Sequence, residues 1–118
     1  KLIPGNILLG TQKHLQFLVT FGPTPKDFAI AVPEGYKGSI YFDLTPHPND
    51  PNGDAYCQFV VTDFSGKKVA DVQGRLDQVK LTLSGKATRG KVKVNAGTYL
   101  AKITASKDCR TLFQLTEA

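Results

Sequence analysis

One segment of the chain, residues 45–59 (TPHPNDPNGDAYCQF), holds side chains that could bind a metal ion. Asp50, Asn52 and Asp54 occupy alternate positions, as the first three ligands of an EF-hand calcium loop do. Carboxylate and amide oxygens are the ligands that calcium prefers in proteins. These three residues are therefore the candidates for a calcium site.

The rest of the EF-hand pattern is missing. Ala55 stands where the loop requires glycine, and Val61 stands at the twelfth position, which requires a bidentate glutamate. The prolines of the segment favour a long connection that neither forms a helix nor pairs as a strand. We expect an exposed loop, with a weak calcium site as the alternative and no other cofactor.

Cysteine chemistry is the next candidate, because Cys57 and Cys109 are the only cysteines. A bridge between them would close about fifty residues and stabilise the fold by roughly 4 kcal/mol. A buried free thiol at Cys57 and a metal pair are the alternatives. The chain has no Cys-x-x-Cys motif, and both histidines are distant from the cysteines in sequence, which disfavours zinc. We expect the disulfide, which implies an oxidising compartment.

Catalysis has no candidate residue in this sequence. His14 precedes an apolar run and His47 lies among prolines, and neither is near a nucleophile with a carboxylate. The sequence has no Gly-x-Ser-x-Gly, His-Glu-x-x-His or phosphate-loop motif. We therefore predict a protein that is not an enzyme.

The elements that must position these residues are strands. Apolar and polar residues alternate with a period of two, which is typical of half-buried antiparallel sheets. The clearest runs are KDFAIAV, SIYFDLT, AYCQFVVTD, QVKLTL and GTYLAKITA. Turns rich in glycine and proline separate them, and no segment has an apolar period of 3.6. The pattern predicts an all-β sandwich or barrel of about eight or nine strands.

The length of 118 residues suits a single domain over residues 1–118, with residues 1–14 as an N-terminal arm or a segment next to a linker. The chain begins at Lys1 without an initiator methionine, so we expect a mature form or a piece of a longer protein, monomeric unless part of that longer chain. No apolar stretch reaches the roughly 20 residues that span a bilayer.

Charge is divided unevenly along the chain. Residues 1–59 hold four Lys/Arg and five Asp/Glu, whereas residues 60–118 hold eleven and five. Such asymmetry is typical either of a polyanion-binding face or of the solvent side of strands, and both interpretations stay open. Exposed aromatic side chains could add stacking contacts, although core or turn packing would also explain them. The candidate binding residues are Tyr36, Tyr41, Phe64, Lys80, Lys91, Lys93 and Lys102.

The order of the strand and turn motifs resembles that of the bacterial pre-peptidase C-terminal domain. KDFAIAVPEGYKGSIYFDLTP is similar to its early core, and DAYCQFVVTDFSGKKVA to its central strand, turn and strand. NAGTYLAKITA resembles its Gly-Thr-Tyr strand, and RTLFQLTEA its last strand. The likeness runs from about Phe17 to Leu115. It implies a jelly-roll-like antiparallel β-sandwich, attached to secreted proteases and other exported enzymes.

The resemblance also implies a non-catalytic role. Some relatives bind collagen or polysaccharide, in certain cases with calcium. The cysteine pair departs from the general pattern, and so does the lack of an acidic cluster near the N-terminus, where calcium-binding relatives carry one.

We therefore predict a secreted, periplasmic or cell-surface accessory module of an exported enzyme. It would bind a polysaccharide, a collagen-like polymer or a protein partner, or tether the neighbouring domain, with no specific nucleic acid. The alternative is a free-standing secreted inhibitor or immunity-type protein.

Overall fold

The alternating segments form strands in the computed structural model of the chain, which describes residues 5–11 and 13–118. There are ten: β1 (Asn6–Leu8), β2 (His14–Phe21), β3 (Lys26–Val32), β4 (Ser39–Pro46), β5 (Tyr56–Asp63), β6 (Lys68–Arg75), β7 (Lys80–Ser84), β8 (Val92–Lys93), β9 (Gly97–Ala105) and β10 (Cys109–Glu117). A single turn of 3-10 helix, η1 (Leu76–Gln78), joins β6 to β7 and is the only helical element of the described residues. The predicted all-β sandwich is confirmed.

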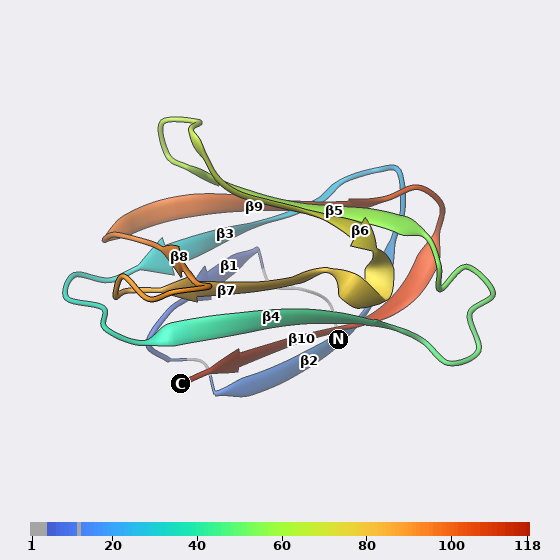
Figure 1. The fold of residues 1–118 in the computed structure, drawn as a ribbon, viewed down its shortest axis with the longest axis horizontal. Helices are drawn as coiled ribbons and strands as arrows, with labels where there is room; N and C mark the ends of the chain where they lie inside the picture. The colour runs from blue at the N-terminus through green and yellow to red at the C-terminus, as the bar shows by residue number, and fades with distance from the viewer. Residues whose placement is uncertain (1–4, 12) are drawn as a thin grey trace.

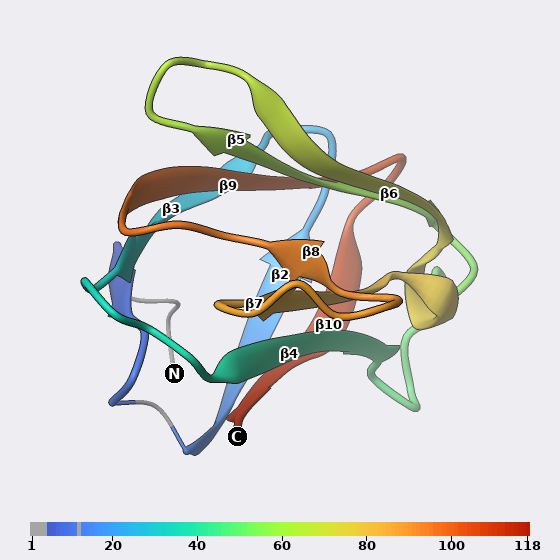
Figure 2. The same ribbon diagram turned by 60° about the vertical axis from the view of Figure 1, so that its left-hand side comes forward.

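Two five-stranded sheets form the two layers of the sandwich (Figures 1 and 2). Sheet A has the order β1-β3-β9-β5-β6, and sheet B has the order β2-β10-β4-β7-β8. All pairs are antiparallel except β1 with β3 and β7 with β8, which are parallel edge pairs. These two edge strands bring the count above the predicted eight or nine, because segments of three and two residues are too short to show a period.

The core between the layers is rich in phenylalanine. Six of the seven phenylalanines are buried, because they occupy the inward positions of the alternating strands. Phe113 of β10 is at the centre, and its ring lies 5.8 to 6.4 Å from the rings of five others. Burial of each such side chain stabilises the fold by about 1.5–3 kcal/mol. The aromatic contacts therefore hold the two sheets together.

Part of the expected N-terminal arm is built into sheet A. Ile7 and Leu9 are buried in the core, and the Leu9 N–H donates a 2.9 Å hydrogen bond to the Ala31 carbonyl. Residues 1–4 and 12, which belong to the same predicted segment, lie outside the described residues.

The predicted disulfide is absent, and this prediction is corrected. Cys57 lies on β5 in sheet A and Cys109 on β10 in sheet B, and both are buried free thiols. The Cys109 thiol instead donates a 3.7 Å hydrogen bond to the Arg110 carbonyl oxygen. Burial, together with the charge that a Cys109 thiolate would carry, raises the pKa of Cys57 to about 12. Both cysteines therefore pack as small apolar side chains.

Candidate functional site

A groove of about 630 Å³ crosses the outer face of sheet A. It runs over β3, β9 and β5, whose outward residues face solvent because their neighbours on each strand fill the core. Its walls are Gly5, Asp27, Phe28, Ala29, Val60, Thr62, Lys68, Leu100, Ala101 and Lys102. The groove thus lies mainly on the hydrogen-bonded strands in the middle of sheet A.

Strand register arranges these walls in two rows. Ala29 is opposite Leu100, which is opposite Thr62, and this row is mostly apolar. In the next row Asp27 is opposite Lys102, and Lys102 is opposite Val60. Leu100 is 49% exposed, which is unusual for a leucine in the middle of a sheet. The groove therefore offers exposed aliphatic surface beside an ammonium group.

The two sides of the groove differ in how their charges are held. On the β6 side, Lys68 forms a 2.8 Å ion pair with Asp71, and Gln58 and Gln73 also donate to that carboxylate. These hydrogen bonds, with that from Lys68 the largest contribution, lower the pKa of Asp71 to about 2. Lys102 takes part in none of the ion pairs found within residues 5–11 and 13–118. Its ammonium group can therefore meet a ligand.

A second hollow, of about 400 Å³, lies at one end of the sandwich between the β3–β4 loop and the residues around β8. Gly85 makes this packing possible, because a Cβ atom there would lie 2.0 Å from the Tyr36 carbonyl oxygen. The Tyr36 hydroxyl donates a 2.6 Å hydrogen bond to Glu117. Burial, followed by that carboxylate, raises the pKa of Tyr36 above its usual range. Tyr36 therefore serves as a wall of the hollow, with its hydroxyl already paired.

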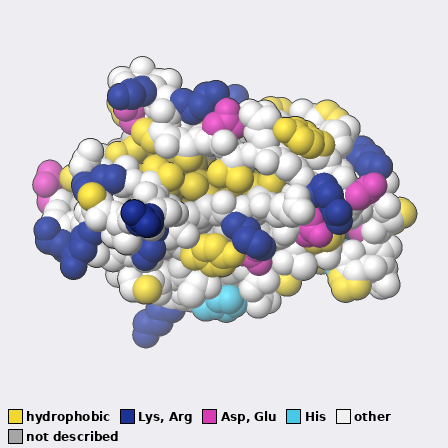
Figure 3. Space-filling view, viewed as in Figure 1, with side chains coloured by type: hydrophobic (Ala, Val, Ile, Leu, Met, Phe, Trp, Pro, Cys, Tyr) yellow, Lys and Arg dark blue, Asp and Glu magenta, His cyan; other side chains and the backbone are white. Residues whose placement is uncertain are grey.

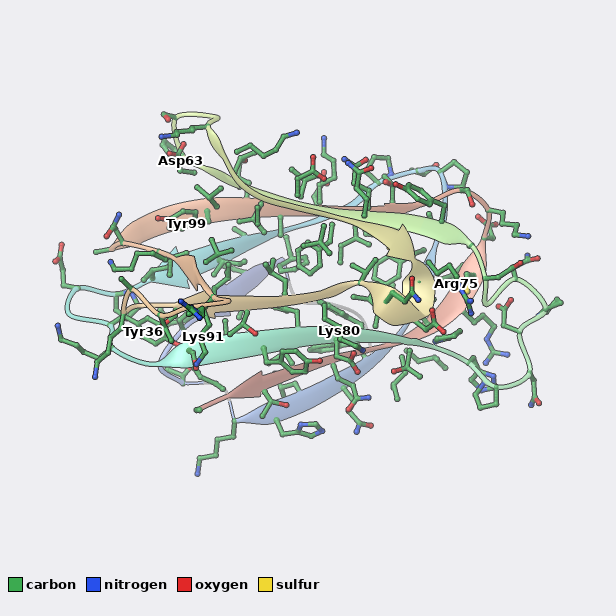
Figure 4. The ribbon with its side chains drawn as sticks, viewed as in Figure 1. Tyr36, Asp63, Arg75, Lys80, Lys91 and Tyr99 are labelled. Carbon is green, nitrogen blue, oxygen red and sulfur yellow. The ribbon has the colours of Figure 1, made fainter. Side chains whose placement is uncertain are left out.

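Lys37 and Lys93 line this hollow, and three more positive side chains lie in the neighbouring segment between β7 and β8. The group, which we call the basic end, consists of Lys37, Lys86, Arg89, Lys91 and Lys93. Figure 4 places Tyr36 and Lys91 close to this end of the molecule and Arg75 toward the other. The space-filling view shows Lys and Arg side chains grouped at the same left-hand end (Figure 3). Two of the predicted binding residues, Lys91 and Lys93, thus belong to one cluster.

The remaining predicted binding residues lie elsewhere. Tyr41 and Lys80 are on the outer face of sheet B, where Lys80 forms an ion pair with Asp43. Phe64 is 81% exposed in the turn between β5 and β6, which projects beyond the sandwich in Figures 1 and 2. The aromatic candidates and the lysines therefore do not form one site.

The candidate calcium loop lies between β4 and β5, and its acidic residues have other partners. Asp50 accepts hydrogen bonds from the backbone N–H groups of Asn52 and Arg110, at 2.7 and 2.6 Å. Both bonds lower its pKa, that from Arg110 the most. Asp54 forms a 3.5 Å ion pair with Lys107. Among the described residues, no group of three or more His, Cys, Asp or Glu is placed to hold a metal ion.

Sequence reasoning did not single out Leu100, Val60 or Ala29, which form the apolar part of the groove. A signal was present for Leu100, since it occupies the face of GTYLAKITA that otherwise carries Thr98, Lys102 and Thr104. An apolar residue on a polar face marks exposed hydrophobic surface, but it does not reveal which other strands lie beside it.

Comparison with known proteins identifies the fold of the chain. No protein-family model and no curated protein matches this sequence. Among solved structures, the chain is similar to the pre-peptidase C-terminal domain of collagenase from Bacillus anthracis, with 10% identity and a TM-score of 0.55 over 100% of both chains. The chain has the fold of a pre-peptidase C-terminal domain.

The chain is also similar to part of a β-glucosidase from Paenibacillus barengoltzii, with 14% identity and a TM-score of 0.45. That alignment covers 93% of this chain and 11% of the β-glucosidase. The similarity to the Bacillus anthracis domain confirms, at the level of the fold, the resemblance noted in the strand motifs. Within the described part of the chain, no helix has the length and apolar character needed to cross a membrane.

Proposed function

We propose that this chain is a non-catalytic accessory module of an exported enzyme and that it binds an extended polymer in the groove of sheet A. The observation that carries the proposal is the exposed apolar row of Ala29 and Leu100 beside the ammonium group of Lys102. The fold supports it, since the similar solved structure is a domain of a collagenase.

The shape and chemistry of the groove suit a polymer chain. It is open and extends over three strands, so a polysaccharide or collagen-like chain can lie across it without its ends being enclosed. The aliphatic floor suits the C–H faces of sugars or small side chains, and Lys102 and Asp27 suit hydroxyl and carbonyl groups. Binding by such a surface requires no catalytic residue.

The positions of the histidines support a non-catalytic role. His14 lies at the edge of sheet B, where its Nδ1 atom is 3.0 Å from the Thr116 hydroxyl oxygen. His47 lies in the β4–β5 loop, where its Nδ1 atom accepts a hydrogen bond from the Asn49 N–H. Each histidine thus serves its local structure, and neither adjoins the groove. The proposed location outside the cytoplasm follows from the resemblance to modules of exported enzymes and no longer from a disulfide.

A pair of leucine variants tests the proposal. Leu100→Ser alters the groove, whereas Leu18→Ser alters a leucine of similar exposure, 44%, on the opposite sheet. The assay is retention on insoluble polysaccharides and on collagen. We expect the wild-type protein and Leu18→Ser to be retained on one of them and Leu100→Ser to be lost. No retention of the wild type, or equal loss for both variants, would contradict binding in the groove. The first of these results would favour the inhibitor role.

A further inference from the structure

We infer that the basic end is a second binding surface, separate from the groove, and that its ligand is an acidic polysaccharide. The inference rests on the proposed function only in taking a polymer as the ligand. Its surface consists of Lys37 in the β3–β4 loop and Lys86, Arg89, Lys91 and Lys93 around the β7–β8 connection.

Positive charge strongly predominates over negative charge at this end. Between Asp77 and Asp108 the sequence contains no Asp or Glu, and residues 85–96 alone hold four of the fifteen Lys and Arg. Glu34 is the one acidic residue that lines the hollow. The nearby carboxylate of Glu117 accepts hydrogen bonds from Tyr36 and from the Gly10 N–H. Excess positive charge over one face attracts polyanions and speeds their association.

The five cations of the basic end are exposed, and none of them takes part in an ion pair within the described ranges. Elsewhere, by contrast, Lys68, Arg75, Lys80 and Lys107 each pair with an aspartate. The Lys93 ammonium contacts the Asn95 side-chain oxygen at 2.8 Å, a neutral partner that leaves its charge in place. The unneutralised charges repel one another, and an anionic ligand would relieve that repulsion.

Backbone hydrogen bonds hold these side chains on a defined surface. Ser84 pairs with Lys93 in the parallel β7–β8 ladder, and the Val94 N–H donates a 2.8 Å bond to the Ser84 carbonyl. The Ser84 hydroxyl accepts from the Lys86 N–H at 3.1 Å. Leu83 and Val94 are both buried, so the segment that carries the four cations between them is anchored in the core at each end. A ligand therefore meets cations whose backbone positions are already fixed.

The chemistry of the surface favours a polysaccharide over a nucleic acid. Single-stranded nucleic acids bind through aromatic side chains that stack on bases, at about 1–3 kcal/mol per base. The basic end has no exposed aromatic ring, since Tyr36 is half-buried and hydrogen-bonded to Glu117. Lysine predominates there over arginine, and its ammonium group is a compact point charge without the bidentate geometry that arginine offers. Dispersed sulfate or carboxylate groups on a sugar chain fit such a surface.

Two triple variants test the inference with heparin as the probe. Lys86→Gln/Arg89→Gln/Lys91→Gln neutralises the basic end, and Lys26→Gln/Lys107→Gln/Arg110→Gln removes the same charges at the opposite end. Both variants have the same net charge, so any difference reports the position of the charges. We expect the basic-end variant to bind heparin about tenfold more weakly and the control to bind nearly as the wild type does. The salt dependence of binding should become shallower for the basic-end variant alone.

Thermal unfolding shows whether each variant is folded, and exposed lysines should tolerate glutamine. Equal weakening by both triple variants, or no heparin binding by the wild type, would overturn the inference. So would binding of single-stranded DNA as tight as that of heparin and equally sensitive to the basic-end variant. A failure of the proposed polymer binding in the groove can be told apart from a failure of heparin binding at the basic end, because Leu100→Ser should leave heparin binding unchanged.

Discussion

The carboxylate of Asp50 accepts a 2.6 Å hydrogen bond from the backbone N–H of Arg110, a residue 60 positions away in the chain. Its other oxygen accepts from the Asn52 N–H at 2.7 Å. The Asn52 side chain in turn donates to the Asp108 carbonyl at 2.9 Å. The β4–β5 loop is therefore fastened to the start of β10, and Asp50 is the side chain that fastens it.

Asp50→Ala should lower the midpoint of thermal unfolding by several degrees, because it removes the acceptor from two backbone N–H groups. Asp54→Ala is the matched control, since Asp54 makes only a 3.5 Å ion pair in solvent. Calorimetry on both variants makes the comparison. Equal midpoints for the two would show that Asp50 has no anchoring role.

Removal of calcium should leave the wild-type melting curve unchanged. A calcium ion needs six to eight oxygen ligands, and the carboxylate of Asp50 is already hydrogen-bonded to backbone N–H groups. A site of millimolar affinity would add roughly 1.4 kcal/mol at tenfold excess of calcium. Melting curves with calcium and with a chelator measure this effect. A rise in melting temperature with calcium that Asp50→Ala abolishes would reveal a metal site.

Acid should destabilise the protein below about pH 4. The pKa values of Asp50 and Asp63 are lowered by hydrogen bonds, and that of Asp71 is lowered to about 2. A carboxyl group whose pKa is lower in the folded state stabilises that state above its unfolded pKa of about 3.9. That stability is lost as the pH falls through the folded pKa.

Urea unfolding between pH 2 and pH 6 checks the acid effect, with Asp71→Asn as the comparison. The variant should be less stable than the wild type at pH 6, and the difference should shrink toward pH 2. A difference that stays constant over this range would contradict the role given to Asp71.

Phe113→Ala should destabilise the fold by about 3–5 kcal/mol, because it empties the centre of the aromatic cluster. The ring of Phe113 is stacked on that of Phe42, with a centroid distance of 5.9 Å and an interplanar angle of 9°. Phe64→Ala, at the exposed turn, should change the stability by less than about 0.5 kcal/mol. Chemical denaturation of both variants tests the contrast. Similar losses of stability in the two variants would contradict the central position of Phe113 in the core.

The two cysteines should behave as protected thiols. Because both are buried and the pKa of Cys57 is raised to about 12, the native protein should react slowly with a thiol reagent at pH 8. Denatured, unreduced protein should give two thiols per chain. A count of zero after denaturation would mean that the two residues are bridged.

The sequence alone determined the strands and the core. Alternation predicted that Ile40, Phe42 and Leu44 share one face, and all three are buried. This works because the side-chain period of a strand is a local property of the backbone. The same alternation placed Cys57 in the core but could not find its neighbours. The disulfide prediction failed for that reason, since both cysteines are buried free thiols and alternation does not show which side chains pack against each of them.

Tertiary structure decided which residues come together in the groove and at the basic end. Leu100 and Ala29 meet because β9 pairs with β3, and Lys37 approaches the β7–β8 residues because Gly85 packs against Tyr36. The anchoring of Asp50 to Arg110 likewise joins distant parts of the chain. These contacts depend on which strands become neighbours, and that choice is made by the packing of the whole core. The local pattern of residues along the sequence therefore does not predict which strands are neighbours.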